Sequence, residues 1–299
     1  MTEQVERIAA SDRAALERCV RSETPVVIEG AARGWRAVVE WSPAYLVERI
    51  GDVAIRYKRS ESNVHPDFHA ATLAAMFATG ATTFAEFVAA ITGGDLAERA
   101  RSLFTGDEQF LLRRRDGQTS INDALRPLLD DVAVPEIAED RLYTVWAWFS
   151  GIGVRTWLHY DNNGCHNLNA QITGSKRCAL FPPSELARLA PFPLGGANPA
   201  HNCSQLDIDR VDLADGAQLT ARLDAGDLLF IPAWWFHTFL HLGEFNSNVN
   251  FWWKPETPSL NPVAARQVLL DAVRHANLDV ADLAVRGVLE RLDRAIIGT

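Results

Sequence analysis

Seven short runs of β-branched and aromatic residues between Arg141 and Lys254 constrain the fold more than any other feature of the sequence. In chain order they read LYTVWAWFS, VRTWLHY, NLNAQIT, KRCALF, LLFIP, FHTFLHL and NSNVNFWW. Turn residues separate the runs, and most of them show no helical spacing of apolar residues. Short runs in such close succession are typical of an antiparallel barrel or sandwich. We therefore predict a β core over residues 141–255.

Helical and mixed patterns flank this β core. Before it, Val5–Val20 has helical spacing, PVVIEG and VAIRYKR are typical of strands, and SPAYLVERIGD and TTFAEFVAAITGG are typical of helices with good end signals. Residues 1–140 are thus predicted to form an α/β segment beside the barrel. After the core, Val263–Ala276 and Val280–Ile297 carry apolar residues three and four positions apart. Residues 256–299 are predicted to form a helical pair.

Charge and cysteine content narrow the classes of function. The 299 residues include 29 Lys and Arg against 38 Asp and Glu, which gives a formal charge of −9. This acidic balance argues against broad, non-specific attraction to nucleic acid or to an anionic membrane. No apolar run approaches the roughly 18 residues of a membrane span, and the N-terminus has no apolar signal core. Four cysteines in a chain of this length do not suggest a disulfide framework. We expect a cytoplasmic protein with reduced cysteines.

His159 and Asp161 are the strongest candidates for metal ligands. Residues two apart on a strand point to the same face, so this imidazole and carboxylate can meet at one point. His237 follows the strand in AGDLLFIPAWWFHTF and is the candidate third ligand. Two histidines and one carboxylate form a facial site with open positions, which suits ferrous iron that also binds a cosubstrate and oxygen. Taken alone, His159 and Asp161 would also fit an ordinary pair on a surface or in a core.

Polar residues near these ligands suggest a second function for the barrel interior. Lys176 follows a Gly-Ser turn, and a lysine that faces a polar interior can pair with the carboxylate of a bound acid. An exposed hairpin lysine is the alternative. Strand alternation also groups several amides on shared faces, namely Asn167, Asn169 and Gln171 on one strand and Asn246, Asn248 and Asn250, with Trp252, on another. Such amides suit an interior that binds a polar ligand, whereas on a solvent face they carry no functional information.

Together these motifs resemble the JmjC oxygenases, a family of cupin-like proteins. The resemblance rests on LHYDNNGCHNLNAQITGSKRCALFPPSE, AGDLLFIPAWWFHTF and NSNVNFWWKP, and PVVIEGAARGWRAVVEWSPAYLVERIGD is similar to the family's lead-in. It covers most of residues 25–255 and is nearest to the branch of asparaginyl hydroxylases that inhibit hypoxia-inducible factor. The fold that it implies is mainly β: a double-stranded β-helix, or cupin jelly roll, with flanking helices.

The same resemblance implies an Fe(II)- and 2-oxoglutarate-dependent oxygenase. Such an enzyme uses O2 to hydroxylate a peptide, protein or small molecule, and it releases succinate and CO2. By this resemblance His159, Asp161 and His237 would hold the iron. Thr156 and Lys176 would bind the distal carboxylate of 2-oxoglutarate, the cosubstrate. The pocket for that cosubstrate would be lined by Asn167 and Asn250.

Three positions depart from the family pattern. The loop after Asp161 is longer than in the asparaginyl hydroxylases, so His166 or Asn169 could take the place of Asn167. Phe110 stands where those enzymes have a tyrosine that reaches 2-oxoglutarate. Strict alternation also places Thr156 on the face opposite to His159, unless a bulge or a strong twist intervenes.

The predicted C-terminal helices bear on assembly. Apolar residues of the second helix occupy more than one stripe, so covering the barrel would not bury all of them. In the asparaginyl hydroxylases, helices at the matching place interlock between two subunits. We therefore expect a homodimer through the residues after about Asn261, with a mostly apolar interface.

Two other functions fit the sequence. One is a different metal-dependent cupin enzyme, with zinc or another metal bound by residues drawn from Cys165, His166, His201, Cys203 and His241. These residues lack the short Cys-x-x-Cys spacing of a structural zinc site. The other is a cupin binding module without catalysis, and the three intact candidate ligands argue against it. No motif identifies the substrate.

Overall fold

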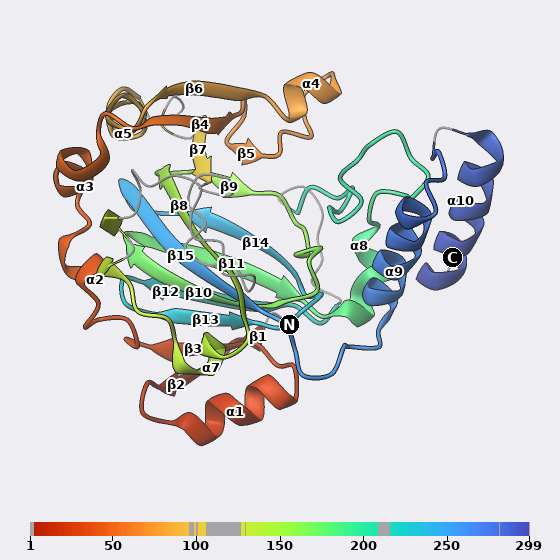
Figure 1. The fold of residues 1–299 in the computed structure, drawn as a ribbon, viewed down its shortest axis with the longest axis horizontal. Coiled ribbons are helices and arrows are strands. Elements are labelled where there is room, and N and C mark those ends of the chain that lie inside the picture. The colour runs from red at the N-terminus through yellow and green to blue at the C-terminus, as the bar shows by residue number, and fades with distance from the viewer. Residues whose placement is uncertain are drawn as a thin grey trace.

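The computed structural model describes residues 3–95, 99, 101–105, 127–128, 130–208, 216–280 and 282–298. Two β-sheets dominate these residues and helices pack outside them (Figure 1). This arrangement confirms the predicted mainly β fold with a double-stranded β-helix core and flanking helices. No helix within these ranges is both long and apolar enough to cross a membrane.

The larger sheet joins strands from both halves of the chain. In spatial order it contains β2 (Glu6–Ala9), β3 (Val26–Glu29), β13 (Leu228–Ile231), β10 (His166–Thr173), β15 (Phe245–Trp253), β8 (Leu142–Gly151), β7 (Ser102–Thr105), β4 (Ala54–Arg59) and β6 (Thr79–Thr83). Five of these strands come from residues before position 140, so the N-terminal segment is continuous with the barrel strands. The division of the chain at residues 140 and 255 stays a prediction.

The smaller sheet faces the larger one. In spatial order it contains β1 (Glu3–Gln4), β12 (Leu219–Asp224), β11 (Ser175–Phe181), β14 (Phe236–His241), β9 (Arg155–Thr156) and β5 (Val64–His65). Each of the seven predicted runs overlaps one strand, namely β8, β9, β10, β11, β13, β14 or β15. Strand β12 was not among the predicted runs.

Helices cover the outer face of the larger sheet. They are α1 (Arg13–Arg21), α2 (Arg36–Glu40), α5 (Phe84–Thr92) and α7 (Glu136–Glu139), and α3 (Pro43–Ile50) packs on α5. The N-terminal caps predicted for α3 and α5 are both present. Ser42 caps α3 by accepting a hydrogen bond from the Tyr45 amide at 3.2 Å, and Thr83 and Glu86 form a capping box at the start of α5.

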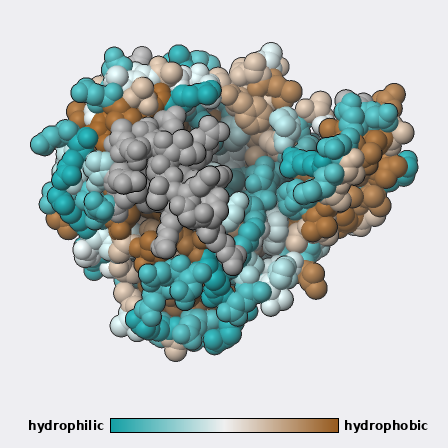
Figure 2. Space-filling view, in the orientation of Figure 1, coloured by the Kyte–Doolittle hydropathy of each residue, from teal (hydrophilic) through white to brown (hydrophobic). Residues whose placement is uncertain are grey.

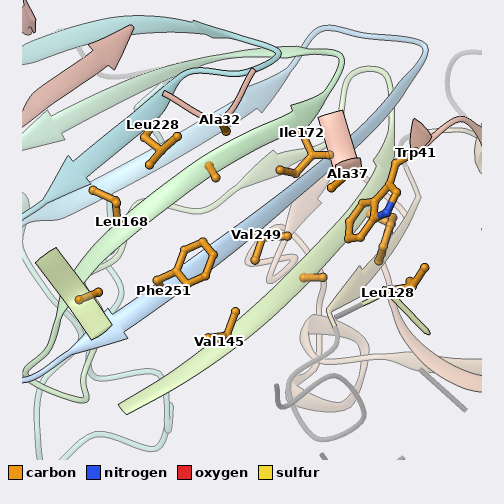
Figure 3. Close-up of a cluster of buried hydrophobic side chains, with 14 of the residues drawn as sticks. Ala32, Ala37, Trp41, Leu128, Val145, Leu168, Ile172, Leu228, Val249 and Phe251 are labelled. Carbon is orange, nitrogen blue, oxygen red and sulfur yellow. The ribbon is translucent and has the colours of Figure 1, made fainter. Parts of the chain in front are cut away.

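Strand alternation divides the larger sheet into an apolar outer face and a polar inner face. Figure 3 shows Val145, Leu168, Val249 and Phe251 of three adjacent strands packed in one hydrophobic cluster, which also includes Trp41. Side chains between these positions point the other way, toward the smaller sheet. The amides predicted to share faces therefore lie inside the barrel, and all of them are buried. The solvent-facing alternative is wrong.

A smaller apolar cluster fills part of the space between the sheets. It contains Val5, Val27, Cys178, Leu180, Ala221, Leu223, Leu229, Ile231 and Phe239. Because this cluster occupies one region of the interior, the inward polar side chains of β10, β14 and β15 gather in the remainder. That remainder contains the candidate site.

The predicted helix over Val5–Val20 is wrong for its first part. Glu6–Ala9 forms β2, parallel to β3, and α1 begins only at Arg13 after the Asp12 cap. Val5 and Ile8 are both buried, but they belong to different clusters on opposite faces of the sheet. A spacing of three residues brings side chains together on a helix and separates them on a strand. The pattern therefore fitted both structures, and pairing with β3 decided between them.

The C-terminal helices α9 (Pro262–His275) and α10 (Leu283–Ile297) form a pair at one end of the molecule, next to α8 (Leu186–Leu189) (Figure 1). A buried ion pair joins them, with Arg266 Nη2 3.1 Å from Asp293 Oδ2. Arg266 also donates to the carbonyl of Phe192, and Asp293 accepts from the amide of Leu194. These bonds anchor both helices to the segment that follows α8.

Candidate active site

His159, Asp161 and His237 converge at one end of the barrel interior. His237 lies on β14, and His159 forms an isolated antiparallel bridge with it, with backbone N–O distances of 3.1 and 2.7 Å. One ligand atom from each of the three residues lies within 4.8 Å of the others. Asp161 Oδ1 is 3.9 Å from the Nε2 atoms of both histidines. Within the described ranges, this is the one cluster of at least three His, Cys, Asp or Glu side chains with the geometry to hold an ion.

Local hydrogen bonds orient both imidazoles in the same way. His159 Nδ1 lies 2.7 Å from the carbonyl oxygen of Trp157, and His237 Nδ1 lies 3.0 Å from that of Trp235. A carbonyl can only accept, so each Nδ1 carries the proton and each Nε2 lone pair is directed at the common point. Burial, followed by the neighbouring His237, lowers the pKa of His159 to about 4. His159 is therefore neutral at pH 7, the form that binds a metal.

The two carboxylate oxygens of Asp161 have different surroundings: one accepts hydrogen bonds and the other faces the histidines. Its Oδ2 accepts hydrogen bonds from Asn167 Nδ2 at 3.0 Å and from Trp252 Nε1 at 2.8 Å. Its Oδ1 faces the two histidines. Burial alone would raise the pKa of Asp161, but the two histidines and these two hydrogen bonds outweigh it and lower the pKa. The site thus offers two imidazole Nε2 atoms and one carboxylate oxygen, which is a facial donor set.

Lys176 lies inside the barrel on β11, with a relative exposure of 1%. Its Nζ donates to Asn169 Oδ1 at 2.6 Å and lies 4.4 Å from the centroid of the Phe239 ring. Burial lowers the pKa of Lys176 to about 7. No carboxylate of the described residues forms a salt bridge with it, and a buried cation without an anion is costly. The site therefore favours an anionic ligand next to Lys176.

A chain of amides connects the interior to the candidate metal ligands. Asn248 Nδ2 donates to Asn250 Oδ1 at 2.5 Å, and Asn250 Nδ2 donates to Asn167 Oδ1 at 3.1 Å. Asn167 in turn contacts Asp161. Of the two alternatives to Asn167, Asn169 contacts Lys176 instead. The other, His166, packs against Phe230 and Trp253, which belong to the outer core.

Thr156 lies at the end of β9, beside β14. Its Oγ1 accepts a hydrogen bond from the amide of Phe239 at 2.9 Å, and Phe239 is the residue under the Lys176 ammonium. The ladder stops after Thr156 and resumes only as the isolated bridge at His159. Strict alternation therefore does not extend from Thr156 to His159. Phe110, the remaining departure from the family pattern, lies outside the described residues.

Several interior residues were not predicted as parts of the site. Trp146, Trp148 and Ser150 share the inner face of β8, and Ser150 Oγ contacts His241 Nδ1 near Lys176. Alternation along LYTVWAWFSG could have placed the three β8 residues on one face, but it gave no reason to prefer that face. The donation from Trp252 to Asp161 likewise depends on a contact between distant segments.

The residues proposed for another metal site do not assemble into one. Cys165 and Cys203 are free and buried, His201 Nδ1 contacts the carbonyl of Pro193, and His241 contacts Ser150. Together with His166, they form no cluster of three potential ligands in the described part of the chain.

Comparison with known proteins supports the family of the fold. A family model described as a cupin-like domain matches residues 12–259. The tRNA wybutosine-synthesizing protein 4 of Gibberella zeae is 29% identical over 256 residues, which cover 84% of this chain and 23% of that protein. The tRNA wybutosine-synthesizing protein 5 of Danio rerio is 29% identical over 226 residues, or 72% of this chain and 64% of that protein.

A third relative is named for a different activity. Lysine-specific demethylase JMJ30 of Arabidopsis thaliana is 26% identical over 246 residues, which cover 79% of this chain and 51% of that protein. The chain thus spans between 23% and 64% of the length of these three relatives. The family match, the two facing sheets and the predicted cupin/JmjC relationship agree, and the chain belongs to the cupin-like domain family.

Proposed function

We propose that this protein is an Fe(II)- and 2-oxoglutarate-dependent oxygenase that hydroxylates its substrate. The observation that carries the proposal is the pairing of two features in one interior. A facial set of two histidines and one carboxylate lies in the same interior as a buried lysine that has no anionic partner among the described residues. Ferrous iron suits the first feature, and a dicarboxylate with one free carboxylate suits the second.

Each group in the site has a distinct task in this function. The bound iron, with 2-oxoglutarate and O2, supplies the oxidant for a C–H bond and leaves succinate and CO2 as products. Lys176 binds the distal carboxylate of 2-oxoglutarate. Thr156 already accepts a hydrogen bond from a backbone amide, so its own hydroxyl proton is available to the same carboxylate. Asn167 and Asn250 line the pocket, and Asn167 with Trp252 keeps Asp161 Oδ1 directed at the iron.

A coupled measurement of metal binding and succinate release tests this function. Wild-type protein with Fe(II), 2-oxoglutarate and O2 should form succinate slowly even without substrate, and Asp161→Ala should form none. Calorimetric titration with Mn(II), a redox-inert substitute, should show one site in the wild type and none in Asp161→Ala. Asp207→Ala removes a carboxylate that pairs with His69 elsewhere and should retain both properties. A wild-type protein that binds Zn(II) and forms no succinate would favour the other cupin enzymes.

The substrate remains a proposal within this function. The relatives are named for tRNA wybutosine synthesis and for lysine-specific demethylation. We propose hydroxylation of a peptide, a protein or a small molecule, and a relationship to the asparaginyl hydroxylases stays a prediction based on motif order. A mass-shift screen of peptide and metabolite pools with enzyme, Fe(II) and 2-oxoglutarate would identify the substrate and its modified position. A cytoplasmic location also stays a prediction.

We further propose that the protein is a homodimer through α9 and α10. Val268, Leu283, Val288 and Leu292 of these helices are 68%, 83%, 46% and 45% exposed. Figure 2 shows hydrophobic surface over this end of the molecule. Leu289, by contrast, is 1% exposed and packs within the chain. Light scattering of the wild type and of a Val288→Arg/Leu292→Arg variant should show a dimer and a monomer, and a monomeric wild type at micromolar concentration would refute the dimer.

A further inference from the structure

A groove on the outer face of the larger sheet lies apart from the candidate metal centre. It has a volume of about 950 Å³, and residues of α1 and α7 form its walls. Exposed residues such as Arg13, Glu136 and Glu256 form its rim, so the groove is reached directly from solvent. Pockets for small molecules have volumes of about 300–1,000 Å³. We call this space the outer groove.

The floor of the outer groove is apolar. Ile28, Leu228 and Leu168 come from the adjacent strands β3, β13 and β10, and each is at most 4% exposed. Leu168 and Leu228 are labelled on these strands in Figure 3. Leu16 of α1 and Ile137 of α7 add half-buried apolar side chains to the walls. Apolar surface that the chain leaves uncovered in a concavity suits an apolar ligand.

A buried polar side chain, that of His166, also lines the outer groove. It is 3% exposed, and its Nδ1 accepts a hydrogen bond from the Ala233 amide at 3.1 Å. A neutral imidazole that accepts at Nδ1 carries its proton at Nε2. Burial, followed by the charge of Arg141, lowers the pKa of His166 to about 4, so the ring is neutral at pH 7. Nothing in the described part of the chain accepts a hydrogen bond from Nε2–H, which lies at the end of the ring away from the backbone.

The charges at the rim favour a ligand without a charge of its own. Among the described residues, three arginines and five carboxylates line the groove. Two of the arginines already have carboxylate partners: Arg13 Nη2 is 2.6 Å from Glu136 Oε2, and Arg141 Nη1 is 2.9 Å from Glu256 Oε1. Because the carboxylates outnumber the guanidinium groups, an anionic ligand would be repelled. An ammonium group, in turn, could not accept the hydrogen bond from His166.

We propose that the outer groove binds a neutral, largely apolar small molecule with a carbonyl or ether oxygen that accepts the hydrogen bond from His166 Nε2–H. The apolar body covers the floor, and the oxygen pairs the buried donor. This inference does not depend on the proposed oxygenase function. His166 and Asn167 are consecutive on β10 and point to opposite faces, so Asn167 contacts Asp161 in the interior while His166 faces the groove. The ligand therefore binds without displacing a metal or 2-oxoglutarate.

Four probes that share a phenyl ring on a short alkyl chain test the chemistry of the site. The wild-type protein, with and without Mn(II) and 2-oxoglutarate, is titrated with 4-phenyl-2-butanone, butylbenzene, 4-phenylbutanoate and 4-phenylbutylamine. One hydrogen bond to the ketone corresponds to about fivefold in affinity. We expect the ketone to bind about fivefold more tightly than the hydrocarbon, and the anion and the cation to bind more weakly than the ketone. Mn(II) and 2-oxoglutarate should leave these affinities unchanged, whereas competition would place the probes in the barrel interior and overturn the inference.

Two variants connect the binding to the residues. Leu16→Trp fills the groove from α1 and should abolish binding of both the ketone and the hydrocarbon. His166→Phe keeps an aromatic ring but removes Nε2–H, so the ketone and the hydrocarbon should bind it equally. Leu73→Trp is the matched control, because Leu73 is 44% exposed but lies on α4 (Leu73–Met76), outside the groove, and it should bind the probes as the wild type does. Unchanged binding in Leu16→Trp, or a retained preference for the ketone in His166→Phe, would overturn the inference.

Nitrogen NMR of the imidazole rings gives a second measurement on the wild type. His166 should show a protonated Nε2 and an unprotonated Nδ1, as its hydrogen bond from Ala233 requires. The Nε2–H proton should shift downfield when 4-phenyl-2-butanone binds and should not do so with butylbenzene. A proton on Nδ1, or an Nε2–H signal that the ketone does not move, would overturn the inference.

Discussion

Replacement of Lys176 by Met should stabilise the empty protein and remove its response to 2-oxoglutarate. Burial lowers the pKa of Lys176 from 10.5 to about 7. By proton linkage, a shift of that size costs the folded state about 4 kcal/mol at pH 7. The hydrogen bond to Asn169 and the contact with Phe239 return about 2–3 kcal/mol. Met fills a similar volume without a charge, so we expect a net gain of about 1–2 kcal/mol, or about 2–3 °C in Tm.

The pH dependence of this gain gives a second check. The pKa of Lys176 is lower in the folded state than in the unfolded state, so the unfolded state binds more protons between about pH 7 and pH 10.5. Wild-type stability contributed by this group therefore rises with pH across that window. The advantage of Lys176→Met should be largest below about pH 7 and should shrink toward pH 10.5.

Differential scanning calorimetry with and without ligand measures both effects. With Mn(II) present, 2-oxoglutarate at 100 times its Kd should stabilise the wild type by about 2.7 kcal/mol and should leave Lys176→Met nearly unchanged. Arg177→Met is the matched control, because Arg177 is the next residue on β11 and is exposed. A less stable Lys176→Met protein that still responds to 2-oxoglutarate would refute the reasoning. A gain in stability and a lost response to 2-oxoglutarate in Arg177→Met would show that these two changes do not depend on the burial of the replaced side chain.

Three further predictions concern separate parts of the molecule. The Kd for 2-oxoglutarate should rise by up to about tenfold per pH unit above pH 7, because the anion binds the protonated form of Lys176, whose pKa in the empty site is about 7. Calorimetric titrations between pH 6 and 8.5 that show no change in Kd would contradict this. Trp252→Phe removes one hydrogen-bond donor to Asp161 and should weaken Mn(II) binding by about 10- to 100-fold. Unchanged affinity in a Mn(II) titration would mean that Asn167 alone orients the carboxylate. Arg266→Met leaves Asp293 buried without its partner and should lower the free energy of unfolding in urea by about 3–5 kcal/mol. The double variant Arg266→Met/Asp293→Leu should recover most of this loss. A loss below about 1 kcal/mol in the single variant would show that solvent reaches the pair.

Much of the fold followed from local patterns in the sequence. The seven β runs became strands because β-branched and aromatic residues at alternating positions suit a sheet with one apolar face. The helix over residues 43–50 could be predicted because Ser42 and Pro43 carry its start signal. The helix prediction failed at Glu6–Ala9. Apolar positions three apart fitted a helix there, and no local window of the sequence includes the partner strand β3.

The candidate metal ligands were partly visible in the sequence for a similar reason. His159 and Asp161 are two positions apart, so a short extended segment directs both at one point. Their meeting with His237 required the antiparallel bridge between segments about eighty residues apart. Local patterns made His237 a candidate, because it follows a strand, but they could not pair that strand with the segment of His159. Alternation likewise could not choose between Asn167 and Asn169, because both lie on the same face of β10.

The sequence by itself thus determined seven strands of the barrel and which of their residues share a face, but not β2 or β12. The tertiary structure decided which polar groups meet across strands: Asn167 with Asp161, Asn169 with Lys176, and Trp148 with Lys58. Periodicity along a strand fixes the direction of a side chain but not its neighbour, since the neighbour depends on the register and the order of strands in the sheet. The lowered pKa of Lys176 has the same origin, because it results from burial between two sheets that no single strand encodes.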